Sequence, residues 1–468
     1  MRYCYSLTEA DFGEMPHLAV RPDVGFELRL DTPTAPLDAA ALRAAAPRHD
    51  LLATYRTRPH LGTAETADRE TTGWALRRAC LDAGFPLIDI ELDEPDLHAK
   101  IDTVQAAGAR VVLSHHDLGD GAGLDAALDR ALATRADIIK IIATGHGVRD
   151  ILRLRSFYAR AAGRPLVHFA MGAEYAATRV LCLVAGAPFT FITPRADAAV
   201  APGQLTLEAM DAVFRPTDID PGRLRLFAVI GSPIAHSKSP AFHNAPLKQR
   251  DPNALFVALP AQDAADLDAL WHGMPEVCGL AVTKPMKGWA FAHATTFSDP
   301  HCAALGAVNT LLRRPDGIHA ANTDLLAMQD LLADFGAGTR VRILGYGGLG
   351  KAVAAACLAL DQVPEVCNRT PGKVHDPRVH ELPWAERHAP GAAVVVQATS
   401  VGMAPDVAGC PLERLPEGTR LLIETIYNPI ETRLMTLARA AGVPVVDGLA
   451  LFQGQARIQN QLFLQTLG

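Results

Sequence analysis

Short β-branched runs alternate with Ala-rich amphipathic stretches through roughly the first 210 residues of the chain. A run of four to eight mostly apolar residues, bounded by turn-forming residues, is typical of a buried strand. This pattern predicts eight strands, at 2–6, 25–30, 51–56, 87–92, 110–115, 137–142, 166–170 and 189–193. Helical patterns follow most of them, as at 150–162 and 173–184. Such repetition of strand and helix predicts a (β/α)8, or TIM, barrel.

A polar segment containing Pro and Gly, at 214–223, ends this pattern and is typical of an interdomain linker. Strands and helices alternate again from 224–230 onward. A strand at 341–344, a glycine loop and a helical run at 352–360 predict the start of a Rossmann-type nucleotide-binding unit. We therefore expect an α/β protein with a barrel at 1–213, a linker at 214–223, a substrate-binding subdomain at 224–330 completed by 448–468, and a nucleotide-binding subdomain at 331–447.

Composition restricts the classes of protein that remain. The chain has 468 residues, 49% of them hydrophobic and 20% charged, as in soluble proteins of two or three domains. A net charge of -7 without a basic run argues against a nucleic-acid partner. Eight scattered cysteines without metal-ligand spacing predict reduced thiols and no metal site. No apolar stretch is long enough to span a membrane, so we expect a cytoplasmic protein that acts on small molecules.

A lysine and a histidine are the candidate catalytic residues of the first half. Lys140 interrupts the apolar run at 137–142, and a buried ammonium tends to lose its proton and become a nucleophile suited to Schiff-base chemistry. A lysine reaching solvent and a structural ion pair are the alternatives. His116 follows the preceding strand at the end where barrel enzymes carry their chemistry, and imidazole can transfer protons there. Nearby charges, namely Glu27, Arg29, Arg56 and Arg179, suggest a pocket for an anionic, hydroxylated substrate.

The second half carries a dinucleotide-binding pattern. Glycines at 345, 347 and 350, with a further one at 348, fit G-x-G-x-x-G between a predicted strand and helix. Such glycines let the backbone approach a pyrophosphate. The next strand ends in Asn368-Arg369-Thr370, without the acidic residue that binds an NAD ribose. Arg369 can instead pair with a 2′-phosphate, which favours NADP.

Lys287 and Asp324 are the candidate catalytic residues of this half. Reduction of a ketone by hydride needs a proton and positive charge at the developing alkoxide. An ammonium supplies both, and a carboxylate can orient it. Neutral hydrogen-bonding residues near both positions, Thr283 and Asn309 among them, suit a polyhydroxylated substrate.

The second half resembles shikimate dehydrogenase along nearly its whole length. The matching stretches are 231–240, 282–287, 306–310, 322–324, 345–350, 368–370, 398–403 and 448–455. The resemblance implies that Ser237 and Ser239 hold the substrate carboxylate and that Lys287 and Asp324 form the catalytic pair. It also implies that Thr283, Asn309 and Gln455 contact ring hydroxyls, and that Gly345, Gly347, Gly348, Gly350, Asn368, Arg369, Thr370 and Gly448 bind the cofactor. Two serines in Ser-Lys-Ser are similar to the shikimate form of the family rather than its quinate form. Ala281 stands where the family usually has Asn.

The first half resembles type I 3-dehydroquinate dehydratase. The matching stretches are 27–29, 54–56, 114–117, 137–140, 171–172, 178–179 and 201–204. The resemblance implies that Lys140 forms an imine with the substrate ketone, that His116 removes a proton and assists the loss of water, and that Arg179, Arg29 and Gln204 bind carboxylate and hydroxyls. His60 replaces a usual Glu, and Val200 a common Ser.

The two halves together suggest a bifunctional enzyme of the shikimate pathway. It would dehydrate 3-dehydroquinate to 3-dehydroshikimate and reduce that product to shikimate with NADPH. One alternative is a dehydrogenase whose barrel is a non-catalytic binding or scaffolding domain, a possibility that His60 and Val200 keep open. Another is an oxidoreductase that prefers quinate or uses NAD.

Overall fold

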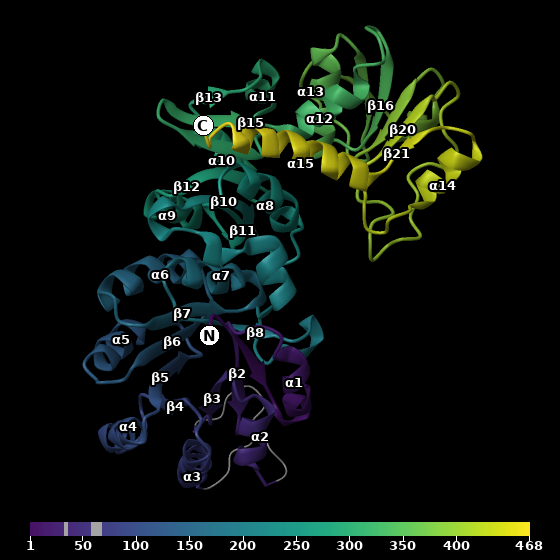
Figure 1. The fold of residues 1–468 in the computed structure, drawn as a ribbon. Helices are drawn as coiled ribbons and strands as arrows, with labels where there is room; N and C mark the ends of the chain where they lie inside the picture. Colours follow the sequence, from purple (N-terminus) through teal and green to yellow (C-terminus); the bar gives the residue numbers. More distant parts are fainter. Residues whose placement is uncertain (32–35, 58–67) are drawn as a thin grey trace. The chain divides into compact units, whose positions relative to one another are not determined.

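The computed structural model describes residues 1–31, 36–57 and 68–468. They form two compact units, Met1–Glu276 and Val277–Gly468 (Figure 1). The sequence predicts a different kind of boundary, a linker at 214–223 between two functional parts of the chain. The extent of the compact units does not test that boundary, which stays a prediction. Among the described helices, none combines the length and the apolar character needed to cross a bilayer.

The first unit begins with a curled parallel sheet that contains all eight predicted strands, each within two residues of its expected ends. The strands are β1 (Tyr3–Leu7), β2 (Val24–Arg29), β3 (Asp50–Thr54), β4 (Leu87–Glu91), β5 (Arg110–Asp117), β6 (Ile138–Thr144), β7 (Leu166–Met171) and β8 (Thr190–Thr193). They lie in chain order from β7 back to β1, followed by β8 and the short β9 (Leu205–Thr206). In the described part of the sheet no ladder joins β7 to β8, but the rings of Phe169 and Phe191 contact each other between these strands. The predicted α/β barrel architecture is confirmed.

Helices cover the outer face of this sheet (Figure 1). They are α1 (Met15–Leu18), α2 (Ala39–Ala45), α3 (Arg69–Asp82), α4 (Leu97–Ala106), α5 (Leu124–Leu132), α6 (Val148–Ala161) and α7 (Ala177–Val184). Short helical turns follow three of the strands, namely η1 (Glu9–Glu14) after β1, η2 (Ala173–Tyr175) after β7 and η3 (Ala196–Ala198) after β8. Because helices pack outside and side chains fill the inside, the strands are buried on both faces. This double burial explains why they read as continuous apolar runs in the sequence.

The first unit continues beyond the barrel. The turns η4 (Ala209–Phe214), η5 (Pro216–Asp218) and η6 (Pro221–Arg223) lead to β10 (Arg225–Gly231), α8 (Ser239–Arg250), β11 (Ala254–Pro260) and α9 (Ala264–Gly273). Strands β10 and β11 pair in parallel, α6 packs on α9, and η2 packs on β11. The contact between α6 and α9 is close, because a Cβ on Gly273 would lie 2.6 Å from the Leu152 side chain.

The second unit contains a group of strands with mixed directions and a parallel sheet. The first group consists of β12 (Val277–Val282), β13 (Thr296–Phe297), β14 (Thr310–Arg314) and β15 (Gly317–Ala321), with the helices α10 (Lys287–His293), α11 (Pro300–Leu305) and α12 (Thr323–Leu332). Strand β14 pairs antiparallel with both β12 and β15. The last helix, α15 (Gly448–Leu464), packs on α12 and also contacts β12 and β14.

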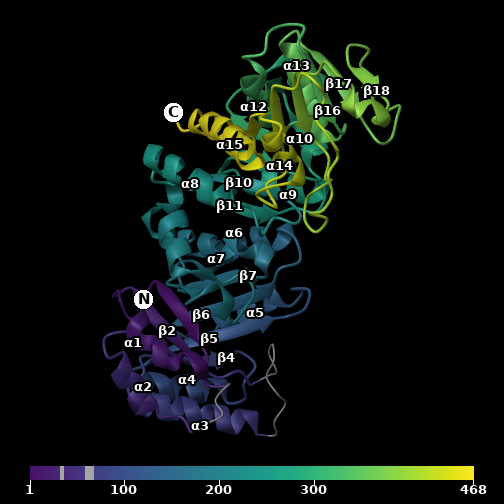
Figure 2. The same cartoon turned by 90° about the vertical axis from the view of Figure 1, so that its right-hand side faces the viewer.

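The parallel sheet has the Rossmann-type arrangement that the sequence predicts (Figure 2). Its order is β18 (His380–Leu382), β17 (Val363–Cys367), β16 (Arg340–Leu344), β19 (Val394–Gln397), β20 (Leu421–Glu424) and β21 (Val445–Val446), with the turn η7 (Trp384–His388) after β18. Val341 and Ile343 of β16 pack with α13 (Gly348–Ala359), whereas Leu344 packs in the cluster that contains α14 (Arg433–Ala440). Helices thus cover both faces of the sheet.

A buried ion pair lies among the apolar residues on the α14 face. Arg342 is 0% exposed and contacts Glu365 of β17 at 2.6 Å, while its Nη1 donates to the carbonyls of Glu386 and Arg387. Arg340 pairs with the same carboxylate from a side chain that is 47% exposed. The two arginines therefore share one partner but differ in burial.

We expect Arg342→Met to lower the free energy of unfolding of the second unit by about 3–5 kcal/mol, because it removes the buried partner of a buried carboxylate. Arg340→Met is the matched control and should cost at most about 1 kcal/mol. Urea-induced unfolding of the full chain, followed by circular dichroism, measures both. Equal effects of the two substitutions would contradict this prediction.

Candidate active sites

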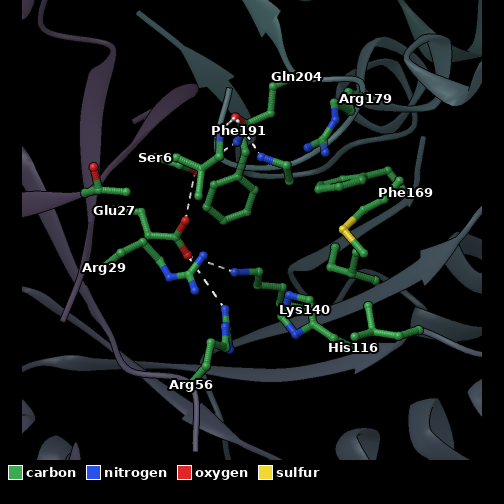
Figure 3. A pocket seen from close by; sticks show the side chains of 16 residues that line it. Ser6, Glu27, Arg29, Arg56, His116, Lys140, Phe169, Arg179, Phe191 and Gln204 are labelled. Atoms are coloured by element: carbon green, nitrogen blue, oxygen red, sulfur yellow. Dashed lines mark hydrogen bonds and ion pairs between the residues drawn. The ribbon is translucent and has the colours of Figure 1, made fainter. Parts of the chain in front are cut away.

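The barrel encloses a pocket of about 280 Å³, here called the barrel pocket (Figure 3). All seven residues that the sequence suggests for a site in the first half line it: Glu27, Arg29, Arg56, His116, Lys140, Arg179 and Gln204. Its wall also includes residues that the sequence did not single out, among them Ser6, Phe169 and Phe191. Residues far apart in the chain thus meet in one cavity.

Lys140 lies on β6, where strand alternation turns it and Ile142 toward the barrel pocket. Its side chain is 3% exposed, so the expected burial is confirmed. Its Nζ donates to Oε1 of Glu27 at 3.0 Å and lies 3.5 Å from Oδ2 of Asp89, so the buried ammonium is compensated rather than isolated. Nζ also lies 4.2 Å from the centre of the Phe191 ring, a distance at which the ring face attracts a cation.

Glu27 is the acceptor at the centre of this network. It accepts hydrogen bonds from Ser6 Oγ at 2.9 Å and Thr54 Oγ1 at 3.1 Å in addition to Lys140. Burial alone would raise the pKa of Glu27, but the charges of Lys140, Arg56 and Arg29 outweigh it and lower the pKa to about 2. Glu27 therefore remains a carboxylate at neutral pH and balances the cations around it.

Asp89 and Ser114 form a second group with Arg56. Arg56 Nη1 donates to Asp89 Oδ1 at 3.0 Å and to Ser114 Oγ at 2.8 Å, and Ser114 Oγ donates to Asp89 Oδ1 at 2.7 Å. Asp89 was missed in the sequence, although it interrupts the apolar run of β4 much as Lys140 interrupts that of β6. A charge inside a strand pattern is therefore the signal that would have found it.

Arg179 differs from the other buried cations of the pocket. Burial lowers the pKa of Arg179 to about 10. Its Nη2 donates to the Pro202 carbonyl at 3.3 Å, and its guanidinium stacks on Phe169 at 4.1 Å. Its Nε has no hydrogen-bond partner, and no carboxylate of the described residues forms an ion pair with it. A guanidinium buried in this way is suited to receive a carboxylate from a ligand.

The remaining predicted residues also line the same cavity. Gln204 Nε2 donates to Ser6 Oγ at 3.1 Å, and its Oε1 accepts the Val200 N–H at 2.9 Å. Arg29 forms a double hydrogen bond with Asp31. His116 faces the pocket, whereas the neighbouring His115 lies 3.6 Å from Asp93. His60 lies outside the described residues.

The Ser237-Lys238-Ser239 motif lies between β10 and α8 of the first unit. The Ser237 N–H donates to the Ile234 carbonyl at 3.0 Å, which closes a turn. The Ser239 N–H donates to Ser237 Oγ at 3.3 Å, and Ser239 begins α8. The two serines are thus carried by one turn and the first residue of a helix.

Lys287 and Asp324 form an ion pair in the second unit. Lys287 begins α10, Asp324 lies in the first turn of α12, and the distance from Nζ to Oδ2 is 3.0 Å. The side chains are 29% and 22% exposed, so both are accessible to a ligand. The pair that the sequence suggests is therefore brought together.

A hydrogen-bonded group lies next to Asp324 in the chain. Asn309 Oδ1 accepts the Thr323 N–H at 2.8 Å, and Thr323 Oγ1 donates to Gln455 Oε1 at 2.9 Å. The Val282 N–H donates to the Asn309 carbonyl at 2.7 Å, which places Thr283 beside the same group. Thr323 was missed as a linking residue, because only the folded chain brings α15 to Asn309.

The glycine loop between β16 and α13 fits a dinucleotide. Gly345 has a φ of +96°, and a Cβ on Gly350 would lie 2.2 Å from the Gly345 carbonyl oxygen, so both positions require glycine. A Cβ on Gly347 or Gly348 would meet no atom within 4 Å. The loop is therefore tight where it packs and open at the helix N-terminus, where a pyrophosphate would be stabilised.

The other predicted cofactor residues follow β17 and precede α15. Asn368 Nδ2 donates to the Thr370 carbonyl at 2.5 Å, and Arg369 is exposed between them. No described carboxylate forms an ion pair with Arg369, so its guanidinium is available to an anion. Gly448 lies in close contact with the backbone of Ile426. A Cβ on Gly448 would lie 2.3 Å from the Ile426 carbonyl oxygen.

Comparisons with known proteins agree with this division of sites. Residues 4–220 match the family model for type I 3-dehydroquinase, and residues 229–311 match that for the shikimate dehydrogenase substrate binding domain. A bifunctional 3-dehydroquinate dehydratase/shikimate dehydrogenase of Arabidopsis thaliana is 29% identical over 88% of the chain and 72% of its own length. A shikimate dehydrogenase (NADP(+)) of Bacillus licheniformis is 33% identical over 51% of the chain and 91% of its own length.

A solved structure spans both halves. The dehydroquinate dehydratase and shikimate dehydrogenase of S. pombe AroM is 20% identical, covers 100% of this chain and 98% of its own, and has a TM-score of 0.42.

We expect Glu27→Gln to destabilise the protein in a way that depends on pH. The carboxylate of Glu27 contributes stability above its ordinary pKa of 4.5, and this contribution is lost as the pH falls through its folded pKa of about 2. The substitution should cost about 3–5 kcal/mol at pH 7. By linkage, roughly half of that difference should remain at pH 3.

Urea-induced unfolding of the wild-type and Glu27→Gln chains at both pH values tests this. Glu14→Gln is the control, because Glu14 pairs with Arg195 at an exposed position. A cost of Glu27→Gln that is the same at pH 3 as at pH 7 would show that the buried carboxylate does not behave as described.

Proposed function

The chain belongs to the shikimate dehydrogenases through its second half and to the type I 3-dehydroquinases through its first, and we propose that it catalyses two consecutive reactions. The barrel dehydrates 3-dehydroquinate to 3-dehydroshikimate, and the second half reduces 3-dehydroshikimate to shikimate with NADPH. The first assignment rests on one observation. Lys140, His116 and Arg179 line the same pocket, and the Nε of Arg179 has no hydrogen-bond partner. The ion pair of Lys287 and Asp324 carries the second.

In the barrel, Lys140 gives a proton to His116 and attacks the ketone carbon as the neutral amine. His116 returns that proton to the former carbonyl oxygen, which leaves as water and gives a cationic imine. The positive charge on the imine nitrogen acidifies the neighbouring C–H bond, and His116 removes that proton. His116 then returns a proton to the departing hydroxyl, and hydrolysis of the imine releases the product. Arg179 holds the substrate carboxylate.

The carboxylates beside Lys140 have a role in this chemistry. The nitrogen is positively charged both in the resting ammonium and in the imine, so Glu27 and Asp89 face a cation in each state. Because they are already oriented by Ser6, Thr54 and Arg56, they stabilise the cationic intermediate without reorganising.

In the second half, Lys287 donates a hydrogen bond to the ketone oxygen and then its proton to the developing alkoxide. Asp324 orients the ammonium through the 3.0 Å contact between Nζ and Oδ2. Thr283, Asn309 and Gln455 bind ring hydroxyls, and Ser237 with Ser239 binds the carboxylate. NADPH supplies the hydride.

The residues of the glycine loop would hold this cofactor. Gly347 and Gly348 leave room for the pyrophosphate at the N-terminus of α13, and Arg369 pairs with the 2′-phosphate.

A barrel that only binds or scaffolds is disfavoured. Such a role would not require one cavity to hold both a lysine paired with carboxylates and an arginine without a carboxylate partner among the described residues. The eight cysteines are all free, so we place the enzyme in a reducing compartment, the cytoplasm.

A coupled assay on the purified chain tests both halves at once. With 3-dehydroquinate and NADPH as the only reactants, the wild-type protein should oxidise NADPH. Lys140→Ala should abolish this signal yet leave the oxidation of NADPH by added 3-dehydroshikimate intact. Lys287→Ala should lower the latter turnover by about 10²–10⁴-fold, because it removes the proton donor.

Borohydride trapping with 3-dehydroquinate supplies the control for the imine. Mass spectrometry should find the adduct on Lys140 and not on Lys100, a buried lysine that pairs with Glu94 outside the pocket. An active Lys140→Ala barrel, or an adduct on neither lysine, would remove Lys140 from its role.

We expect Arg369→Ala to raise the KM for NADP by about 10–100-fold, since a charge-assisted pair with phosphate is lost. The KM for NAD should change less than twofold, because NAD lacks the 2′-phosphate. Arg378→Ala, which removes an exposed arginine paired with Asp376 in the same part of the chain, is the matched control. Equal losses with NADP and NAD in Arg369→Ala would argue against this role.

A further inference from the structure

A carboxylate from the barrel binds the turn that precedes Ser237. Glu174 lies in η2, after β7. Its Oε2 accepts the Ile234 N–H at 2.7 Å, and its Oε1 accepts the Ala235 N–H at 3.0 Å. The contact joins positions 60 residues apart, and both carboxylate oxygens are used.

These two N–H groups belong to the backbone that carries the serines. Ile234 also accepts the Ser237 N–H through its carbonyl, and Ser237 Oγ accepts the Ser239 N–H. Glu174 thus holds one end of a hydrogen-bonded turn whose other end presents both serines. Hydrogen bonds to a carboxylate are roughly twice as strong as bonds between neutral groups, so a bidentate one restricts the turn substantially.

Glu174 is itself held firmly on the barrel. The Tyr175 N–H donates to the Gly172 carbonyl at 3.0 Å, and the Tyr175 carbonyl accepts Thr178 Oγ1 at 2.7 Å. The Gly172 N–H donates to the Pro202 carbonyl, two residues before Gln204 of the barrel pocket. Since η2 also packs on β11, the carboxylate is presented by a fixed element rather than by a loose loop.

We propose that Glu174 is a positioning residue for the dehydrogenase reaction. The barrel supplies the carboxylate that orders the Ile234–Ser237 turn, so that Ser237 and Ser239 meet the substrate carboxylate without a further ordering cost. The inference rests on the proposed function, in which these serines bind that carboxylate. Glu174 acts on substrate affinity, not on hydride transfer.

Steady-state oxidation of shikimate by the full chain tests this role. Glu174→Ala should raise the KM for shikimate about tenfold, because the freed turn must be ordered at each binding event. The kcat, the KM for NADP and the dehydratase activity should stay within about twofold of wild type. Glu174→Gln, which keeps one acceptor oxygen, should give a smaller rise in KM.

Arg155→Ala is the matched control, because Arg155 pairs with Glu276 between α6 and the end of the same unit without contacting the turn. It should leave the KM for shikimate unchanged. An unchanged KM in Glu174→Ala, or an equal rise in Arg155→Ala, would overturn the proposal. If Glu174→Ala loses dehydratase activity through misfolding, an unchanged KM in Glu174→Gln would overturn it. A wild-type chain that does not oxidise shikimate would overturn the proposed function itself.

Discussion

The ammonium of Lys140 lies inside the barrel, where an uncompensated charge would cost several kcal/mol, and Glu27 and Asp89 offset that cost from two other strands. Each carboxylate then needs donors of its own. Glu27 takes them from Ser6 and Thr54, and Asp89 from Arg56 and Ser114. The burial of this one cation therefore requires polar side chains on strands β1 to β6 and determines which of them form hydrogen bonds with one another. The same charges suit a cationic imine, so the stability of the fold and the chemistry of the site depend on one arrangement.

Not every buried charge in the molecule is compensated by an ion-pair partner in this way. Arg342 is paired with Glu365 and bonded to backbone carbonyls, so each of its three guanidinium nitrogens already donates a hydrogen bond within the protein. Arg179 is equally buried but stacks on Phe169, donates a hydrogen bond to the Pro202 carbonyl and has no carboxylate partner among the described residues. This difference distinguishes the structural role of Arg342 from a ligand-binding role for Arg179. The buried charge of Arg179 is fully compensated only when an anionic ligand binds.

The strands and several residues that line the barrel pocket could be predicted because both leave local signals. Strands buried on two faces produce continuous apolar runs, and a charge such as Lys140 within one is conspicuous. Asp89 leaves the same signal and was overlooked. Ser6 and Phe191 leave none, since a serine or phenylalanine in a strand is ordinary until folding directs it into the pocket. Glu174 was equally invisible, because its function depends on a contact with backbone N–H groups 60 residues away.

The way the two halves join follows from packing more than from the composition of the connecting segment. Residues 214–223 have the polar, Pro- and Gly-containing character of a linker, yet Phe214, Pro216 and Ile219 are buried, η5 packs on α7, and η4 packs on α8. The first strands after this segment share a compact unit with the barrel, with α6 on α9 and η2 on β11. A flexible tether would leave the serine turn to order itself when substrate binds. A packed connection lets the barrel supply Glu174 at a fixed position, so the fusion contributes to the second site as structure and not only as a source of its substrate.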